Sequence, residues 1–377
     1  MIEGCRQKKI LFCIVSILLF ASSLFGEDFK RALPGRTFSF PRDHFSHPEF
    51  KTEWWYYSGH LQSPDKQSFG YQLTFFRTGL RRDSSNRKSR WAIQNLYFAH
   101  LALTDESQGK FDYREKISRG SLGEAGALSH TSSEKNFRIW IENWMMEGSG
   151  PGMQNHLLKA GDRDLGIQLM LTPERDPVVH GLKGIRQKAE GEGYASHYYS
   201  ITRLKTEGRL LLKGKEVPVN GLSWMDHEFG SDQLREYQAG WDWFSIQMDN
   251  GADLMFYQIR QKDGKPDPHS GGTILFSDGK NDSLTLKDFK IQILENWKSP
   301  KSGASYPSRW SITAPGRGIA LVISPTVKNQ ELITNESTHV TYWEGSVNVE
   351  GRFENHPSRG KGYVELTGYV KPFSKGI

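Results

Sequence analysis

The sequence of 377 residues contains only two cysteines, Cys5 and Cys13, and both lie within its first 26 residues. If this start is removed on export, the remaining chain has no disulfide and no thiol chemistry, so its stability must come from a packed core. Long apolar runs are scarce as well. The run from Ile10 to Ala21 is shorter than the roughly 20 residues that a membrane-spanning helix needs.

This apolar run has the surroundings of a secretory signal peptide. Arg6, Lys8 and Lys9 precede it, and the small residues from Ala21 to Ser23 follow it. We therefore predict a signal peptide over residues 1–26, cleavage between about residues 21 and 27, and an exported protein that is periplasmic or envelope-associated. An uncleaved membrane anchor is the alternative.

A strong charge imbalance is also missing. The whole chain has a net charge of +6, and removing residues 1–26, with three basic residues and one acidic residue, leaves +4. That excess is too small to indicate a nucleic-acid partner. The chain also lacks the G-x-S-x-G, P-loop and dinucleotide-binding motifs, so hydrolase, nucleotide and NAD chemistry have no local support, and we expect no cofactor.

Short segments with alternating polar and apolar residues dominate the chain after residue 26, and helical periodicity is hard to find. "SFGYQLTFFRT" and "ADLMFYQIRQ" are two such segments, and turn signals such as "SDGKND" separate them. The sequence "DNG" at residues 249–251 is a strong hairpin signal. This pattern predicts an antiparallel all-β chain built as barrels or a sandwich.

A weak internal repeat indicates two such units. Glu53 to Arg77 and Gly240 to Arg260 share an aromatic strand, a turn and a second aromatic strand that ends in arginine. We therefore predict two similar barrels in tandem, with the join within residues 229–240.

The segment "TEWWYYSGHL", residues 52–61, places large aromatic side chains on both faces of one predicted strand. The alternation puts Trp54, Tyr56, Ser58 and His60 on one face and Trp55, Tyr57, Gly59 and Leu61 on the other. We expect the first set to face the interior of the first barrel, with Trp54 and Tyr56 filling much of it. A mixed cavity that contains Ser58 and His60 is the alternative.

Five segments together resemble one known family. They are "EWWYYSGHL", "GYQLTFFR", "GEGYASHYYSITRL", "GLSWMDHEFGS" and "GWDWFSIQMDNG". These segments resemble the landmarks of the AttH/CrtC family of attachment proteins and carotenoid 1,2-hydratases, over roughly residues 36–372. The resemblance implies an all-β fold of two tandem lipocalin-like antiparallel β-barrels, with an N-terminal domain over 36–230 and a C-terminal domain over 236–377.

The resemblance also implies a chemistry. Hydratases of this family add water across an isoprenoid double bond without a cofactor, and their proposed proton donor corresponds to Asp226, with Trp224 beside it. Protonation of a trisubstituted alkene leaves a tertiary carbocation, which aromatic faces can stabilise. An apolar pocket can keep a carboxylic acid protonated near neutral pH.

The same segment argues against a metal site. Trp224, Asp226 and Glu228 would share one face of a strand and His227 the opposite face, so these side chains cannot converge on one ion. We predict no metal, and we expect the ligand to contact the following residues: Tyr198, Trp241, Trp243, His227, Glu228, Trp54 and Tyr56. The alternative is a structural hydrogen-bond cluster at the domain join, with a buried acid paired with His227 or Arg77.

Three functions remain open on these residues. The first is a carotenoid 1,2-hydratase-like enzyme that hydrates or isomerises an apolar isoprenoid or lipid, with Asp226 as the acid. The second is a non-catalytic carrier of a lipid-like ligand in the cell envelope, and the third is an accessory protein with a vestigial pocket. We expect an apolar small molecule or lipid as the partner, with association to the envelope membrane left open.

Overall fold

The computed structural model describes residues 29–80, 93–131, 136–232 and 234–372. The predicted signal peptide, including both cysteines, lies outside these residues. Within them, no helix is long and apolar enough to span a bilayer.

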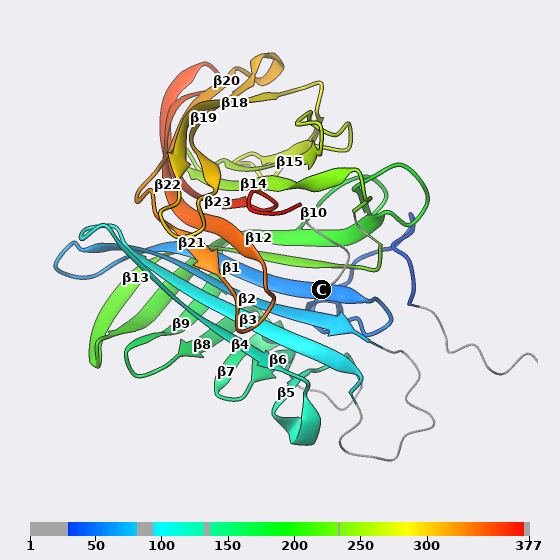
Figure 1. The fold of residues 1–377 in the computed structure, drawn as a ribbon, viewed down its shortest axis with the longest axis vertical. Helices are drawn as coiled ribbons and strands as arrows, with labels where there is room; N and C mark the ends of the chain where they lie inside the picture. The colour runs from blue at the N-terminus through cyan, green and yellow to red at the C-terminus, as the bar shows by residue number, and fades with distance from the viewer. Residues whose placement is uncertain (1–28, 81–92, 132–135, 233, 373–377) are drawn as a thin grey trace, which may run out of the picture.

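Antiparallel strands dominate the described residues, which confirms the all-β prediction (Figure 1). The first sheet has 13 strands and runs in the order β4-β3-β2-β1-β13-β12-β9-β8-β7-β6-β5, with β10 and β11 paired to β12. Its strands are β1 (Thr52–Gln62), β2 (Ser68–Gly79), β3 (Asn95–Asp105), β4 (Lys110–Ser118), β5 (Ala125–Ala127), β6 (Arg138–Ile141), β7 (Trp144–Ser149), β8 (Asn155–Gly161), β9 (Leu165–Pro173), β10 (Val178–Val179), β11 (Arg186–Gln187), β12 (Ala195–Leu212) and β13 (Lys215–Gly230).

The second sheet has ten strands and runs in the order β17-β16-β15-β14-β23-β22-β20-β19-β18, with β21 paired to β22. Its strands are β14 (Gln238–Met248), β15 (Asp253–Gln261), β16 (Gly271–Leu275), β17 (Asn281–Thr285), β18 (Lys290–Lys298), β19 (Ser305–Ala314), β20 (Ile319–Pro325), β21 (Glu331–Ile333), β22 (Thr341–Phe353) and β23 (His356–Leu366). Short 3-10 turns are η1 (Arg42–His44), η2 (Ser121–Gly123), η3 (Pro151–Met153) and η4 (Pro315–Arg317).

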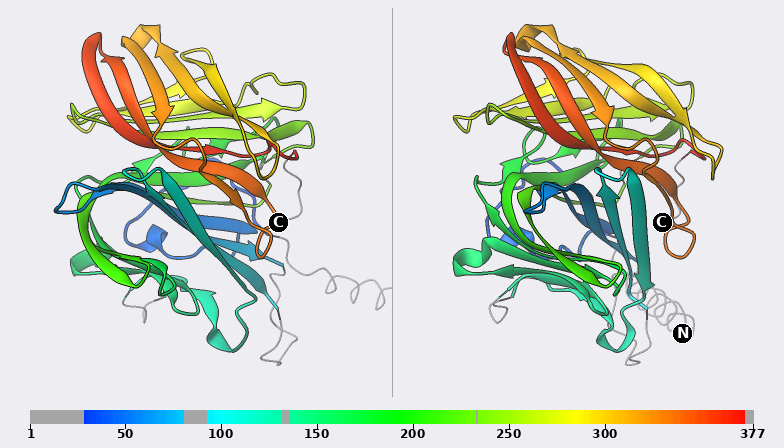
Figure 2. Two further views of the ribbon diagram at one scale, coloured as in Figure 1. Left: turned by 60° about the vertical axis from the view of Figure 1, so that its left-hand side comes forward. Right: turned by 90° about the vertical axis from the view of Figure 1, so that its left-hand side faces the viewer.

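The two sheets are stacked one on the other (Figure 2). The first sheet forms a nearly closed barrel and the second forms a half-barrel. The tandem lipocalin-like arrangement is as predicted, and the second barrel is more open than the first. β13 ends at Gly230 and β14 begins at Gln238, so the change of sheet falls within residues 229–240.

The repeated hairpins occupy equivalent places in the two sheets, as the repeat predicts. β1 lies between β2 and β13, and β14 lies between β15 and β23. In both units the first strand therefore pairs with the second strand on one side and with the last strand on the other. Glu53 is paired with Arg77 in the first hairpin, and Gly240 with Arg260 in the second.

The prediction of which face of β1 points into the first barrel is wrong. Trp55 and Tyr57 are buried in the core of the first barrel, whereas Tyr56 packs in a separate cluster with side chains of the second sheet, and Trp54 lies at its edge. His60 also faces the second sheet, with its Nε2 2.9 Å from the carbonyl oxygen of Gly362. Strand alternation correctly separates the two sets, but the second sheet covers the outer face of β1, so both faces are largely buried.

Candidate functional site

A cluster of aromatic side chains fills the space between the two sheets. We call it the interdomain cluster. Its buried members are Tyr56, Tyr198, Trp224, Trp243, Met255, Tyr257, Ile259 and Tyr363, with Trp54, Leu234 and Trp241 half-buried against them. It therefore contains each of the aromatic residues predicted to contact a ligand, and these come from β1, β12, β13 and β14.

Asp226 lies in β13 beside this cluster and is only 4 % exposed. Tyr56 of β1 and Ser200 of β12 are its register partners on either side. Its Oδ1 accepts a hydrogen bond from Trp224 Nε1 at 2.7 Å and another from the hydroxyl of Ser200. Burial raises the pKa of Asp226 to about 7, and these donors only partly oppose the effect. The carboxyl group can therefore hold a proton near neutral pH.

Ser200 connects Asp226 to a buried histidine. His180 Nε2 is 2.6 Å from Ser200 Oγ, and His180 Nδ1 is 2.9 Å from Thr273 Oγ1 of the second sheet. Burial, together with the nearby cations Arg186 and Lys188, holds the pKa of His180 well below its usual value. A neutral His180 can donate from Nε2 to Ser200 while Ser200 donates to Asp226, which keeps Oδ1 an acceptor.

Two further acids face the cluster from the second sheet. Trp243 of β14 is flanked in register by Glu365 of β23, which is flanked in turn by Glu344 of β22. Burial raises the pKa of Glu365 to about 7, and burial with the neighbouring Glu365 carboxyl holds the pKa of Glu344 well above its usual value. The site therefore contains two buried acids, Asp226 and Glu344, and the half-buried Glu365, and all three have raised pKa values.

The sequence analysis did not identify Glu344 or Glu365. The internal repeat could have indicated Glu365. Glu53 and Gly240 are the register partners of Arg77 and Arg260, and aligning these two residues makes Tyr56 equivalent to Trp243. Asp226 is the register partner of Tyr56 on the last strand of the first sheet, and Glu365 is the partner of Trp243 on the last strand of the second. The two acids thus occupy equivalent positions in the two units.

Glu228 lies on the same side of β13 as Asp226 and is ion-paired. Its Oε1 is 2.6 Å from Lys188 Nζ, and both side chains are largely buried. Lys188 Nζ also lies 5.8 Å from the ring centroid of Tyr257, a member of the interdomain cluster. Glu228 therefore belongs to the polar border of the cluster.

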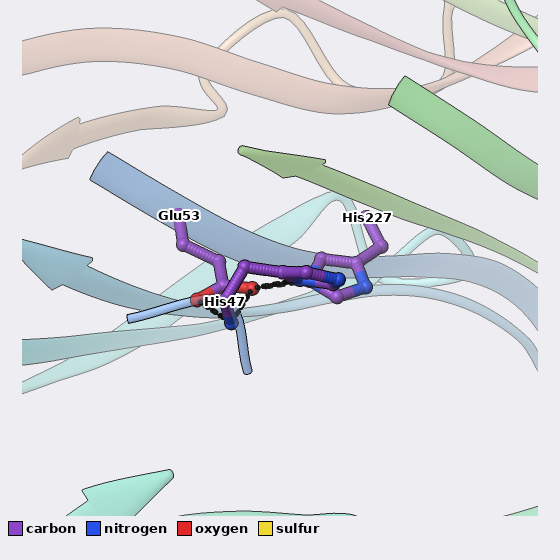
Figure 3. Close-up of side chains that lie close together, drawn as sticks. All are labelled: His47, Glu53 and His227. Carbon is purple, nitrogen blue, oxygen red and sulfur yellow. Dashed lines mark hydrogen bonds and ion pairs between the residues drawn. The ribbon is translucent and has the colours of Figure 1, made fainter. Parts of the chain in front are cut away.

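His227 points to the other face of β13, away from the ligand-contacting position expected of it. There it meets His47 and Glu53, and Figure 3 shows both rings bonded to the same carboxylate. His47 Nδ1 and His227 Nε2 are each 2.9 Å from Glu53 Oε1. The strand geometry that separates His227 from Asp226 and Glu228 is as predicted, and its physical reason is the two-residue period of a strand.

Ligand atoms of His47, Glu53 and His227 lie within 4.8 Å of one another, which is close enough for a metal centre. Every one of these atoms has a protein partner. Glu53 Oε2 accepts from Arg77 Nε at 3.1 Å, His227 Nδ1 is 3.1 Å from Tyr199 Oη, and His47 Nε2 is 3.1 Å from Asp43 Oδ1. Although burial opposes it, bonding to both histidines and the charge of Arg77 hold the pKa of Glu53 well below its usual value. The group forms a hydrogen-bonded network that includes the cation Arg77, which favours a structural role.

A pocket of about 480 Å³ lies at the surface of the second unit, lined by Asp249, Asn250, Phe353, Glu354, His356, Pro357 and Ser358. Asp226 is not among the residues that line it. An open cavity beside Asp226 stays a prediction. In the structure, aromatic rings pack closely beside this residue. Tyr56 and Trp243 have ring centroids 5.1 Å apart, and Trp224 and Trp243 have centroids 6.3 Å apart.

Comparisons with known proteins identify the family and the fold. The model of the AttH-like family matches residues 31–369. A crystal structure of an AttH-type protein from Nitrosomonas europaea is 30 % identical and covers 90 % of this chain and 100 % of its own, with a TM-score of 0.80. Kievitone hydratase from Nectria haematococca shares the fold at 13 % identity, with a TM-score of 0.67 over 91 % of this chain and 99 % of its own.

One curated protein matches part of the chain. The dehydratase asqC of Emericella nidulans is 19 % identical over 197 residues, which is 50 % of this chain. The match spans about half the length of that relative, at 54 %.

Proposed function

The chain belongs to the AttH-like family, and from this premise we propose that it is a hydratase-type enzyme. It would add water to an apolar isoprenoid or lipid double bond, or isomerise the bond, without a cofactor. The interdomain cluster would be the active site and Asp226 the acid. The dehydratase and hydratase names of two similar proteins support this class of chemistry.

The observation that carries the proposal is the surroundings of Asp226. This acid is buried against aromatic rings and receives hydrogen bonds from neutral donors, Trp224 and Ser200. Its pKa of about 7 leaves a large protonated fraction at neutral pH, which suits a general acid. An acid paired with a cation, such as Glu53 with Arg77, would have no proton to give.

The reaction follows from these groups. The Asp226 proton moves to one alkene carbon, and a tertiary carbocation forms at the other carbon. The faces of Trp224, Trp243 and Tyr56 stabilise that cation. Water then forms the new carbon–oxygen bond, and its released proton restores the acid form of Asp226. Glu365, at the equivalent position across the interface, is a second group that can accept this proton in transit.

Asp226→Asn tests the proposal. The amide preserves the shape and can still accept hydrogen bonds from Trp224 and Ser200, but it has no proton to transfer. We expect the variant to fold and to lose turnover by at least about 100-fold, the lower range of a general-acid contribution. The assay incubates the protein with lycopene or geraniol in D2O and detects the deuterated, hydrated product by mass spectrometry.

The exposed Asp263→Asn is the matched control, because its carboxylate contacts the side chain and backbone N–H of the exposed Lys265, away from the interdomain cluster. Wild-type turnover that persists in Asp226→Asn would remove Asp226 from the chemistry. Tight binding of either compound by both proteins, with no product from either, would favour the second candidate, a carrier of a lipid-like ligand. The aromatic walls of the cluster suit that function too.

A further inference from the structure

Arg186 of β11 is a buried cation at the border of the interdomain cluster. It is 5 % exposed, and its guanidinium carbon lies 3.6 Å from the ring centroid of Tyr257. The backbone leaves room for this group at Gly271 of β16, where a Cβ atom would come within 2.8 Å of Arg186 Nη2. The ring and the glycine together hold the guanidinium in one place.

Two nitrogen atoms of this guanidinium lack a hydrogen-bond acceptor among the described residues. Arg186 Nε and Nη2 are buried and have no hydrogen-bond partner among the described residues. A buried charged donor without an acceptor is costly, and such a group calls for an explanation. The ring of Tyr257 offsets part of the cost through a cation–π contact but accepts no conventional hydrogen bond.

The neighbouring cation has a different environment. Lys188 also approaches Tyr257, but its charge is neutralised by Glu228 at 2.6 Å. Glu228 is also the carboxylate whose charge acts on Arg186, and it is already engaged by Lys188. Within the described part of the chain, the positive charge of Arg186 is therefore left without a dedicated counter-charge.

We propose that Arg186 binds a negatively charged oxygen of the substrate, so that the ligand of the interdomain site is an apolar chain that ends in a carboxylate or a similar oxyanion. This proposal rests on the proposed function for the location of the site and deepens it by naming the substrate class. A planar guanidinium with adjacent free N–H groups suits a carboxylate, which can accept two hydrogen bonds from it. The aromatic rings would then contact the apolar chain and bring its double bond toward Asp226.

Isothermal titration calorimetry with two isoprenoids of the same carbon skeleton tests the proposal. Geranate carries a carboxylate, and geraniol carries a neutral hydroxyl group. We expect wild-type protein to bind geranate roughly tenfold or more tightly than geraniol, as a charge-assisted hydrogen bond implies. Arg186→Gln should abolish this preference, and Arg186→Lys should retain part of it because it keeps the charge but loses the planar fork.

Arg209→Gln is the control, since Arg209 is exposed and pairs with Glu216 on a strand surface. This variant should keep the wild-type preference. Equal affinity of wild-type protein for geranate and geraniol would overturn the proposal and indicate that water satisfies the guanidinium. A preference that survives in Arg186→Gln would overturn it as well.

Asp226→Asn separates this inference from the proposed function. If Arg186 is the anchor, Asp226→Asn should still prefer geranate, whether or not the wild-type protein turns over any substrate. Loss of turnover in Asp226→Asn with no geranate preference in the wild type would support the enzyme and reject the anchor. A geranate preference in a wild-type protein without turnover would support the anchor and reject the enzyme.

Discussion

Asp226 and Glu53 are buried carboxylic acids on the paired strands β13 and β1, yet their surroundings shift their pKa values in opposite directions. Glu53 is bonded to His47, His227 and Arg77, which favour its charged form. Asp226 receives bonds from the neutral groups of Ser200 and Trp224, so burial dominates. At the scale of single residues, the chemical difference between a structural and a reactive acid comes from these partners.

The raised pKa of Asp226 predicts a pH dependence of stability. Its value of about 7 exceeds the ordinary 3.8. Between these two values the folded state keeps a proton that the unfolded chain has released, so this group stabilises the fold at low pH and the contribution is lost as pH rises. Asparagine cannot ionise. From pH 5 to pH 8 we expect the free energy of unfolding of Asp226→Asn to rise relative to wild type by roughly 2–3 kcal/mol.

Urea denaturation of both proteins at pH 5, 6.5 and 8 measures this difference. The comparison between the two proteins cancels the titration of groups that do not interact with Asp226, such as Glu53, whose lowered pKa acts at lower pH. A difference that stays constant across the three pH values would mean that Asp226 titrates normally in the folded protein.

At the scale of elements, each repeated hairpin carries one acid–arginine pair on its barrel-facing side. Glu53 Oε2 lies 3.1 Å from Arg77 Nε in β1 and β2, and Asp242 Oδ1 lies 2.9 Å from Arg260 Nε in β14 and β15. The arginines are equivalent in the repeat, while the acids differ by two positions and so keep the same face of the strand. Both hairpins thus contain an acid–arginine pair, although the acid occupies a different position in each.

Removing the first of these acids should be strongly destabilising. Glu53→Gln leaves Arg77 buried without its counter-charge, and we expect a loss of roughly 3–5 kcal/mol in the free energy of unfolding. Glu216→Gln, which breaks an exposed pair with Arg209, should cost about 1 kcal/mol or less. Urea denaturation at pH 7 compares the two, and equal losses would show that the network around Glu53 is not stabilised by its charge.

At the scale of the whole molecule, Asp253 joins the two sheets. This buried residue of β15 lies 2.9 Å from Arg203 Nε of β12 and 3.1 Å from Arg175 Nη1 of the first unit, and it accepts a hydrogen bond from Thr202 at 2.8 Å. His100 Nδ1 of β3 adds a contact at 2.8 Å to Tyr342 Oη of β22. These contacts hold the interdomain cluster closed between the sheets.

Asp253→Asn should therefore weaken the whole molecule. Two arginines lose their shared counter-charge, and with a cost of about 3 kcal/mol we expect the melting temperature to fall by roughly 4 °C. Because the sheets share one interface, differential scanning calorimetry should show a single transition in the wild type. The exposed Asp278→Asn, which removes a surface ion pair with Lys280, should leave the melting temperature unchanged. Two separate transitions in the wild type would contradict the coupling.

The sequence by itself determined the all-β class, the two repeated units and the separation of Asp226 from His227, because strand alternation and turn chemistry are local properties. Only the tertiary structure decided that Trp54 and Tyr56 face the second sheet, since alternation defines two faces but not what covers each. Glu344, Glu365 and Arg186 reach the site from strands far along the chain from Asp226. Their charge and burial depend on how the two sheets stack, which no local pattern encodes.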